Sequence, residues 1–433
     1  MKKFLYSVFM LAAVVLAACS NDDNGDTQPK RGMTLNASVE DLSSRATMTD
    51  ESGTWKFAFA ANDQVSVSNN KISNYYTFTN NGSQFTCAQA EVTKEAVDWY
   101  AYFPGNEVDL TKQTGNFADV ANKFAVAGKT AQTTTGEKGL SITLKPKVAV
   151  LRVVAVDKNG ILDIHVKIAD KWVKGLTATK DAAEFTVSTS DTKTTLLHKE
   201  AGEVKAGEIN YVVVPANVKI AIYNGDLLLN TTKAGGLNPG KYYTITSGPT
   251  KGKTNALING QETPVEWVQL WAGGPRFATQ NVAEEMTWTD AANTGKEYVW
   301  GENWRTPTAA EVTEEGGLQA EWNTKEGKWV VKEGSPTINV TTKDGIEETV
   351  EFTGVQPGYT KNTLTLYNKI DSHGYSHFNF WTTTENNGYG CMYRIMIDKG
   401  IIGIFGPSSF ESKDTKCLVR PVLSIQNITN NKK

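Results

Sequence analysis

The chain has 433 residues, which at about 150 residues per domain predicts roughly three domains. Hydrophobic residues at 39% and aromatic residues at 10% indicate a folded protein, because a disordered chain does not carry so many side chains that need burial. A formal net charge of -3 lacks the basic character of a nucleic-acid-binding protein, and four His and four Cys leave few ligands for a metal site. We therefore expect no nucleic-acid partner, no metal and no cofactor.

The first 18 residues are predicted to be a signal peptide. Lys2 and Lys3 precede an apolar run over residues 4–18, which is too short to cross a bilayer about 30 Å thick. The run ends at Leu16-Ala17-Ala18-Cys19, which resembles the lipobox of bacterial lipoproteins, whose cysteine thiol accepts diacylglycerol. The resemblance implies that Cys19 is lipidated and that the chain is made as an outer-membrane lipoprotein precursor.

Residues 19–45 are predicted to form a lipidated pro-segment with a removable strand. Residues 20–26 are polar and acidic; they resemble the surface-export signal of Bacteroidetes lipoproteins and also suit a plain soluble spacer. Residues 33–39 alternate strictly between apolar and polar side chains, which predicts a half-buried β-strand. In the polar loop that follows, Arg45 would be accessible to a trypsin-like protease. Cleavage there would remove the strand and open a groove that another chain could fill, whereas an uncut loop is the alternative.

Residues 54 to about 247 are predicted to form two β-sandwiches in tandem. Their apolar residues follow a period of two or form short runs, separated by Gly, Asn, Pro or Asp every few residues. The run over 148–156 is rich in β-branched residues and suits a buried sandwich strand. We place the first sandwich at 46–157 and the second at 158–249.

Several pieces of this region resemble the fimbrillins of Bacteroidetes, the pilins of their major and minor fimbriae. The resemblance runs over about residues 33–247 and is carried by Arg45-Ala46-Thr47, by residues 62–67, by Trp99–Pro104, by Leu144–Leu151 and by Tyr211–Pro215. It implies transthyretin-like sandwiches, export as a lipoprotein, cleavage between Arg45 and Ala46 by an arginine-specific protease, and polymerisation by donor-strand exchange.

The C-terminal third differs in composition, because eight of the eleven Trp residues follow residue 250. A polar segment at 251–255 is predicted to be a linker. In Arg305-Thr306-Pro307-Thr308, Pro307 and Thr308 predict the start of a short helix, with Thr308 as its cap and Glu311 in its first turn. Most of the eight Trp side chains are expected in the core, and two with polar sequence neighbours are candidates for stacking on sugars: Trp288 and Trp322.

Four separated motifs of this third resemble the Fibrobacter-type paralogous domain, a relative of the formylglycine-generating enzymes. They are residues 266–282, residues 304–311, Phe380–Glu385 and Val419–Val422. The resemblance implies an α+β C-type-lectin-like domain over 255–427. The predicted fold class is thus mainly β, with two tandem sandwiches followed by this domain.

The residues needed for catalysis or metal binding are missing from this domain. The enzymes it resembles use a closely spaced cysteine pair, whereas Cys391 and Cys417 are far apart in the sequence and are a candidate structural disulfide, which leaves Cys87 as a buried thiol. The sugar-binding triplets of calcium-dependent lectins do not occur. His373 and His377 have no third ligand at a suitable spacing. We therefore expect that the protein is not an enzyme.

Together these features predict an accessory subunit of a cell-surface fimbrium, at its tip, that mediates adhesion and biofilm formation. Its expected partners are other fimbrial subunits, the outer-membrane lipid before processing at Arg45, and a glycan or protein ligand on a host or microbial cell. The tip position follows because shaft pilins need a free C-terminal donor strand, and here a further domain follows the second sandwich. The alternative is a surface lipoprotein that binds glycans and never polymerises.

Overall fold

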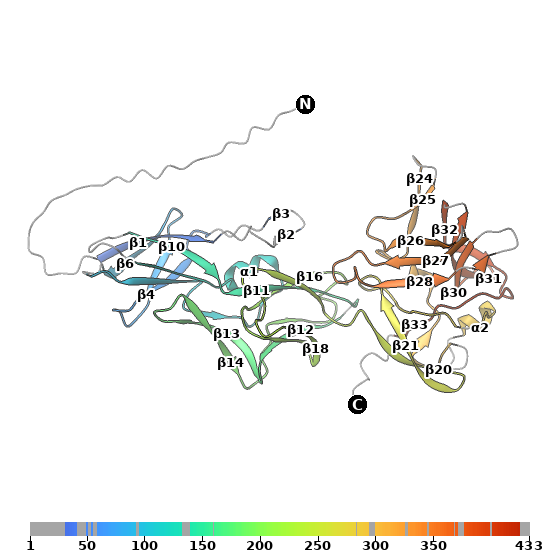
Figure 1. The fold of residues 1–433 in the computed structure, drawn as a ribbon, viewed down its shortest axis with the longest axis horizontal. Helices are drawn as coiled ribbons and strands as arrows, with labels where there is room; N and C mark the ends of the chain where they lie inside the picture. Colours follow the sequence, from blue (N-terminus) through green and yellow to red (C-terminus); the bar gives the residue numbers. More distant parts are fainter. Residues whose placement is uncertain are drawn as a thin grey trace, which may run out of the picture.

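The computed structural model has three bodies arranged in a row (Figure 1). It describes residues 31–40, 49–50, 53–54, 59–91, 95–131, 139–158, 160–282, 284–293, 299–324, 328–343, 346–367, 369–370, 376–398 and 401–424. Strands are by far the commonest regular structure of the described residues, and the helices among them are few and short, which confirms the predicted mainly-β fold. No helix in these ranges is long and apolar enough to cross a membrane.

The first domain is a closed β-barrel formed by strands between residues 31 and 146. Strand β7 (Asp98–Phe103) stops at the Pro104-Gly105 pair, because proline cannot donate to the ladder. A two-stranded hairpin lies outside the barrel and consists of β2 (Thr49–Asp50) and β3 (Gly53–Thr54). In spatial order the barrel strands are β1 (Arg31–Val39), β10 (Gly139–Pro146), β9 (Val126–Ala131), β7 (Asp98–Phe103), β4 (Gln64–Asn69), β5 (Tyr76–Asn80) and β6 (Phe85–Glu91).

The second domain is a sandwich of two sheets. One sheet has the order β16 (Ile209–Pro215), β11 (Val148–Val154) and β19 (Tyr242–Thr246). The other has the order β14 (Glu184–Ser190), β13 (Lys171–Thr179), β12 (Leu162–Ile168), β17 (Ala221–Asn224) and β18 (Leu227–Thr231), with β15 (Leu197–Lys199) paired to β12 and β8 (Glu107–Asp109) paired to β13.

The pairing of β11 corrects the predicted boundary between residues 157 and 158. Strand β11 pairs with β16 along its whole length and with β19 from Val150 to Val154, so it belongs to the second domain and not to a first sandwich over 46–157. The apolar run identified a buried strand, but a strand buried on both faces has no pattern that reveals its sheet partners.

The segment between β7 and β9 joins the first two domains. It contains β8 and helix α1 (Phe117–Lys123), and it reaches over the second domain. The buried side chain of Gln113 both donates to and accepts from the backbone of Val213, and the amide of Tyr211 donates to Gly115. One continuous apolar core therefore runs from Met33 in the barrel to Leu237 in the sandwich.

The C-terminal module, residues 251–424, has its first and last strands in one sheet. That sheet has the order β20 (Lys251–Ile258), β21 (Gln261–Gln269), β22 (Arg276–Ala278), β33 (Val422–Leu423) and β23 (Trp304–Arg305). The predicted linker at 251–255 is wrong, because these residues form the first part of β20 and pair with β21. The other elements are α2 (Trp288–Ala292), α3 (Ala309–Val312), β24 (Ala320–Asn323), β25 (Lys328–Val331), β26 (Thr337–Lys343), β27 (Ile346–Thr353), β28 (Thr363–Tyr367), β29 (Lys369–Ile370), β30 (Ser376–Asn386), β31 (Tyr389–Asp398) and β32 (Ile401–Glu411).

Helix α3 confirms the predicted cap. The Thr308 hydroxyl accepts from the amide of Glu311, and the Glu311 carboxylate accepts from the amide of Thr308, which is a complete capping box. Arg305 also bonds Glu311 through both guanidinium ends. Burial of Glu311 raises its pKa, but the bonds from Arg305 and Thr308 outweigh burial and hold that pKa below its usual value.

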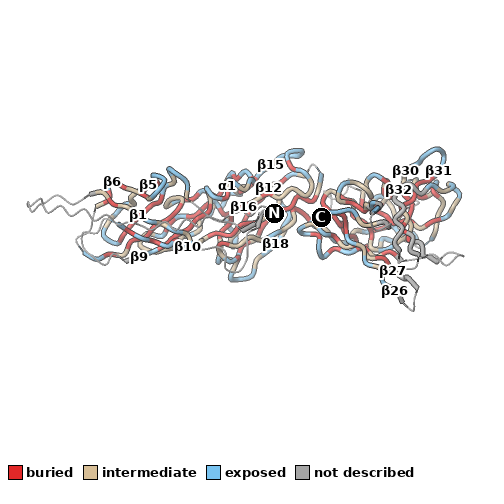
Figure 2. Tube along the Cα trace, turned by 90° about the horizontal axis from the view of Figure 1, so that it is seen from above, coloured by how far each residue is buried: buried red, intermediate tan, exposed pale blue. Residues whose placement is uncertain are grey.

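The joint between the second domain and the module is buried and hydrogen-bonded. Tyr359 is fully buried in an apolar cluster with Val154, Val156 and Ala272. The amide of Gly273 donates to the Val156 carbonyl at 2.7 Å. Across the same joint, Arg276 pairs with Asp157 at 2.9 Å and Lys158 pairs with Glu314. Buried residues run through all three bodies (Figure 2), and this cluster makes the joint part of the packed interior.

Candidate functional site

Strand β1 closes the barrel of the first domain. It lies between β6 and β10, antiparallel to β6 and parallel to β10. Its pairing with β10 runs from Thr34 to Val39, and the amide of Glu40 adds a bond to the Leu144 carbonyl at 2.8 Å. Without β1 the edges of β6 and β10 would both be unpaired, so this strand alone makes the barrel closed.

The side chains of β1 alternate as the sequence predicts. Met33 and Leu35 are 1% and 0% exposed, whereas Asn36 and Ser38 point to solvent. The apolar side chains meet buried partners on both neighbouring strands: Cys87 opposite Met33, Phe85 and Leu140 opposite Leu35, Ile142 opposite Ala37, and Leu144 opposite Val39. The buried face of β1 is therefore a row of apolar side chains that fills a groove between β6 and β10.

Three predicted site residues near β1 lie outside the described residues: Cys19, Arg45 and Ala46. Residues 41–48 follow β1 in the chain, and all other strands of the barrel come after them, beginning with β4. Cleavage at Arg45 would therefore separate β1 from the domain that it completes, without cutting a described strand.

Cys391 and Cys417 are both buried, and the structure does not join them in the candidate disulfide. Cys391 lies in β31 opposite Phe410, whereas Cys417 pairs with Met286 and its thiol donates to Asn379 at 3.4 Å. Burial raises the pKa of the Cys391 thiol. Cys87 is a buried free thiol, as predicted.

Trp288 is a core residue and not an exposed stacking platform. It is 9% exposed, its indole N–H donates to the Thr382 carbonyl at 2.9 Å, and the ammonium of Lys413 lies 4.6 Å from its ring centroid. Gly390 covers the ring so closely that a Cβ there would lie 2.3 Å from it. The general expectation of buried Trp residues is confirmed for Trp267, Trp271, Trp288, Trp304 and Trp381.

Two predictions concern side chains beyond the described part of the chain. For Trp322 only the backbone is described, where it pairs with Trp329 in the β24–β25 hairpin. His373 lies outside the described residues, and His377 is described only as a backbone position of β30. Within the described ranges, no group of three or more His, Cys, Asp or Glu side chains is placed to hold a metal ion.

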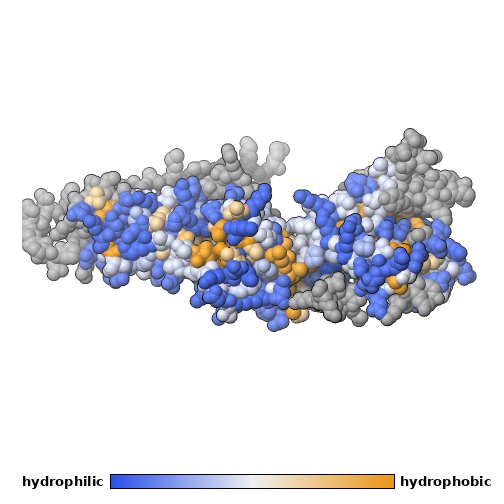
Figure 3. Space-filling view, turned by 60° about the horizontal axis from the view of Figure 1, so that its bottom comes forward, coloured by the Kyte–Doolittle hydropathy of each residue, from blue (hydrophilic) through white to orange (hydrophobic). Residues whose placement is uncertain are grey.

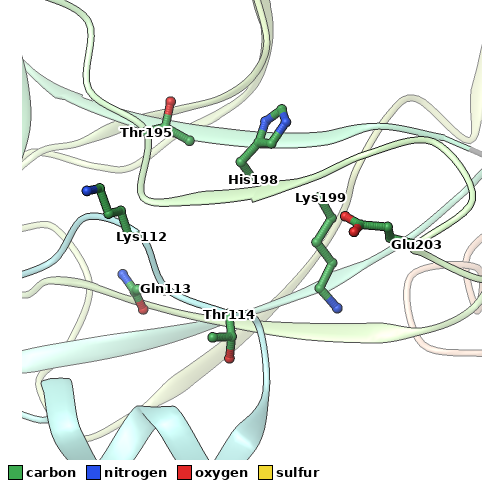
Figure 4. Close-up of a pocket in the computed structure, with 7 residues that line it drawn as sticks. All are labelled: Lys112, Gln113, Thr114, Thr195, His198, Lys199 and Glu203. Carbon is green, nitrogen blue, oxygen red and sulfur yellow. The ribbon is translucent and has the colours of Figure 1, made fainter.

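A polar pocket of about 610 Å³ opens in the second domain (Figure 4). Its lining comes from the segment after β8 and from the region around β15: Lys112, Gln113, Thr114, Thr195, His198, Lys199 and Glu203. Several of its charges are paired. His198 contacts Asp163 and Glu200, and Lys199 pairs with Glu208 at 3.1 Å.

The histidines beside this pocket form a structural network. His198 has a raised pKa because Glu200 and Asp163 accept hydrogen bonds from it. Burial raises the pKa of Asp163, but bonds from His165 and His198 lower it by more. His165 is buried, and its ring nitrogens face the Thr194 carbonyl and the Asp163 carboxylate, both at 2.8 Å. The Thr195 hydroxyl lies 3.5 Å from His165 Nδ1, so oxygen atoms of three residues surround this buried ring.

Strand β18 forms an apolar edge of the second domain. It is the last strand of its sheet, and its Leu227 and Leu228 side chains are about half exposed, as is Ile161 nearby in the fold. Figure 3 shows apolar atoms gathered over the middle of the molecule, where this domain lies. An apolar edge strand of this kind is open to pairing with another chain.

Comparisons with known proteins found remote structural similarity alone. No family model matches the chain, and no curated protein matches it. A candidate cell adhesion protein from Bacteroides ovatus is 10% identical at a TM-score of 0.32, covering 55% of this chain and 96% of its own. A second candidate cell adhesion protein, from Bacteroides uniformis, is 13% identical at a TM-score of 0.31, and the match covers 55% of this chain and 98% of that protein. A fimbrial protein from Bacteroides ovatus is 12% identical at a TM-score of 0.25, and the match covers 92% of this chain and 100% of that protein. Similarities this remote carry no conclusion about the function of this chain.

Proposed function

We propose that the chain is a structural and adhesive subunit of a cell-surface fimbrium, assembled by replacement of β1. One observation carries the proposal: β1 fills a groove between β6 and β10 and is followed directly by the segment that contains Arg45. Lipidation at Cys19 would hold the precursor at the outer membrane until an arginine-specific protease cuts after Arg45. The strand would then leave, and a donor strand of another subunit would take its place.

The chemistry of the groove defines the donor strand. Its walls are apolar, and Phe85, Cys87, Leu140, Ile142 and Leu144 would all gain exposure without β1. A donor must therefore carry apolar side chains at every second residue over about the length of β1, and it must bond both unpaired edges. The driving force is the reburial of this apolar surface, at about 25 cal/mol per Å².

The C-terminal module supports a tip position. The chain passes from β19 into β20 within a few residues, and the module packs on the second domain through Tyr359, Arg276 and Glu314. The chain after β19 therefore continues into the module, and this part of it does not supply a donor strand to a neighbouring subunit. A subunit that accepts a strand but donates none ends a fibre.

The tip position predicts where the module is found on whole cells. Immunogold labelling with antibody raised against residues 255–424 should place gold particles at fibre ends. Antibody against a shaft subunit of the same fibres is the control and should label along the length. Uniform labelling of shafts by the first antibody would exclude the tip position.

A further inference from the structure

A hollow in the second domain has a lining that differs from that of the pocket beside β15. It encloses about 650 Å³ at the ends of β12, β17 and β18, within the range of about 300–1,000 Å³ typical of small-ligand sites. Residues of the two adjoining turns complete it. Its walls include two cationic, three apolar and one hydroxyl side chain: Lys167, Lys219, Ile168, Val218, Ile220 and Thr231.

The hollow carries positive charge that its own lining does not neutralise. No acidic residue lines it, and within the described ranges no carboxylate forms an ion pair with Lys167 or Lys219. Other lysines of the same domain are paired: Lys171 with Asp191 at 3.4 Å and Lys193 with Asp226 at 3.2 Å. Two uncompensated ammonium groups in one concave site favour an anionic ligand.

Two aromatic rings hold one of these ammonium groups. The Nζ atom of Lys167 lies 4.3 Å from the ring centroid of Trp172 and 5.9 Å from that of Tyr223. The two rings contact each other edge to face at 5.7 Å, and both are half-buried. A cation–π contact fixes the position of the ammonium without using an oxygen acceptor. Its N–H groups therefore remain available to an incoming anion.

We propose that this hollow binds an acidic saccharide, a sugar that carries a carboxylate such as a sialic or uronic acid. Lys167 and Lys219 bind the carboxylate, and the apolar C–H face of the sugar ring packs on the apolar part of the wall, which includes Val218 and Ala221. A compact hollow suits a sugar, whereas an acidic peptide would need an extended groove. The proposal does not depend on strand exchange, and it places ligand binding in the second domain.

The test is isothermal titration of the full-length protein with 3′-sialyllactose and with digalacturonate, using lactose as the neutral control. Either acidic sugar should bind, and lactose should not. The variants Lys167→Gln and Lys219→Gln should each weaken binding by about tenfold or more, because each removes a charge-assisted bond. Lys219 is exposed, so its variant will fold. Lys174→Gln, which changes an exposed lysine of β13 outside the hollow, should leave binding unchanged.

Three results would overturn the proposal. The first is the absence of heat with both acidic sugars, and the second is binding that neither Lys167→Gln nor Lys219→Gln weakens. The third is equally tight binding of tetraglutamate, which would show a general anion site with no preference for sugars.

Discussion

Replacing Leu35 with alanine is expected to lower the free energy of unfolding by about 2–5 kcal/mol, because the side chain is fully buried and leaves a cavity between β6 and β10. The neighbouring change Asn36→Ala, on the exposed face of the same strand, should alter it by less than about 0.5 kcal/mol. Urea unfolding of the uncut chain, followed by circular dichroism, measures both. Equal effects of the two substitutions would mean that β1 does not occupy the barrel.

The same strand can be tested as a separable part. A chain that begins at Ala46 should be less stable than the uncut chain and should regain stability when a synthetic peptide of residues 31–40 is added. A peptide with Leu35→Asp is the matched control and should not restore stability, because it would bury a carboxylate. Restoration by both peptides would show that the groove does not recognise the apolar face of β1.

Tyr359→Ala is expected to loosen the joint between the second domain and the C-terminal module. It removes a fully buried aromatic ring from the cluster with Val154, Val156 and Ala272, at a cost of about 3–5 kcal/mol. Differential scanning calorimetry should then show the module melting separately at a lower temperature, while the rest of the chain melts as in the wild type.

Tyr359→Phe provides the control for this joint. The Tyr359 hydroxyl is buried, and within the described residues it has no hydrogen-bond partner. Its removal should therefore be neutral or stabilising by about 1 kcal/mol. If Tyr359→Phe lowers the stability of the joint as much as Tyr359→Ala does, the hydroxyl, and not the packing of the ring, holds the joint.

Sequence patterns correctly predicted those elements that are determined by residues close together in the chain. The alternation of Met33, Leu35 and their neighbours specifies one buried face, and it predicted β1 correctly. The pair Thr308 and Glu311 needs only its own turn to form a capping box. In both cases the side chains that decide the structure are close together in the sequence.

Features that depend on distant partners were not predictable in this way. Strand β20 is a sheet edge with one buried residue among eight, so its sequence is as polar as that of a linker, and only its pairing with β21 shows that it is a strand. The sequence neighbours of Trp288 are polar, but the residue that covers its ring is Gly390 on β31. Trp172 was not identified as a site residue, because only the fold places Lys167 and Tyr223 beside it.

The measurement that tests strand replacement most directly is mass spectrometry of the N-terminal peptide of the protein isolated from cell-surface fimbriae. A subunit that has lost β1 should begin at Ala46. If the assembled protein instead begins at a lipidated Cys19, β1 has stayed in the barrel, and the protein is a surface lipoprotein that does not assemble by replacement of this strand.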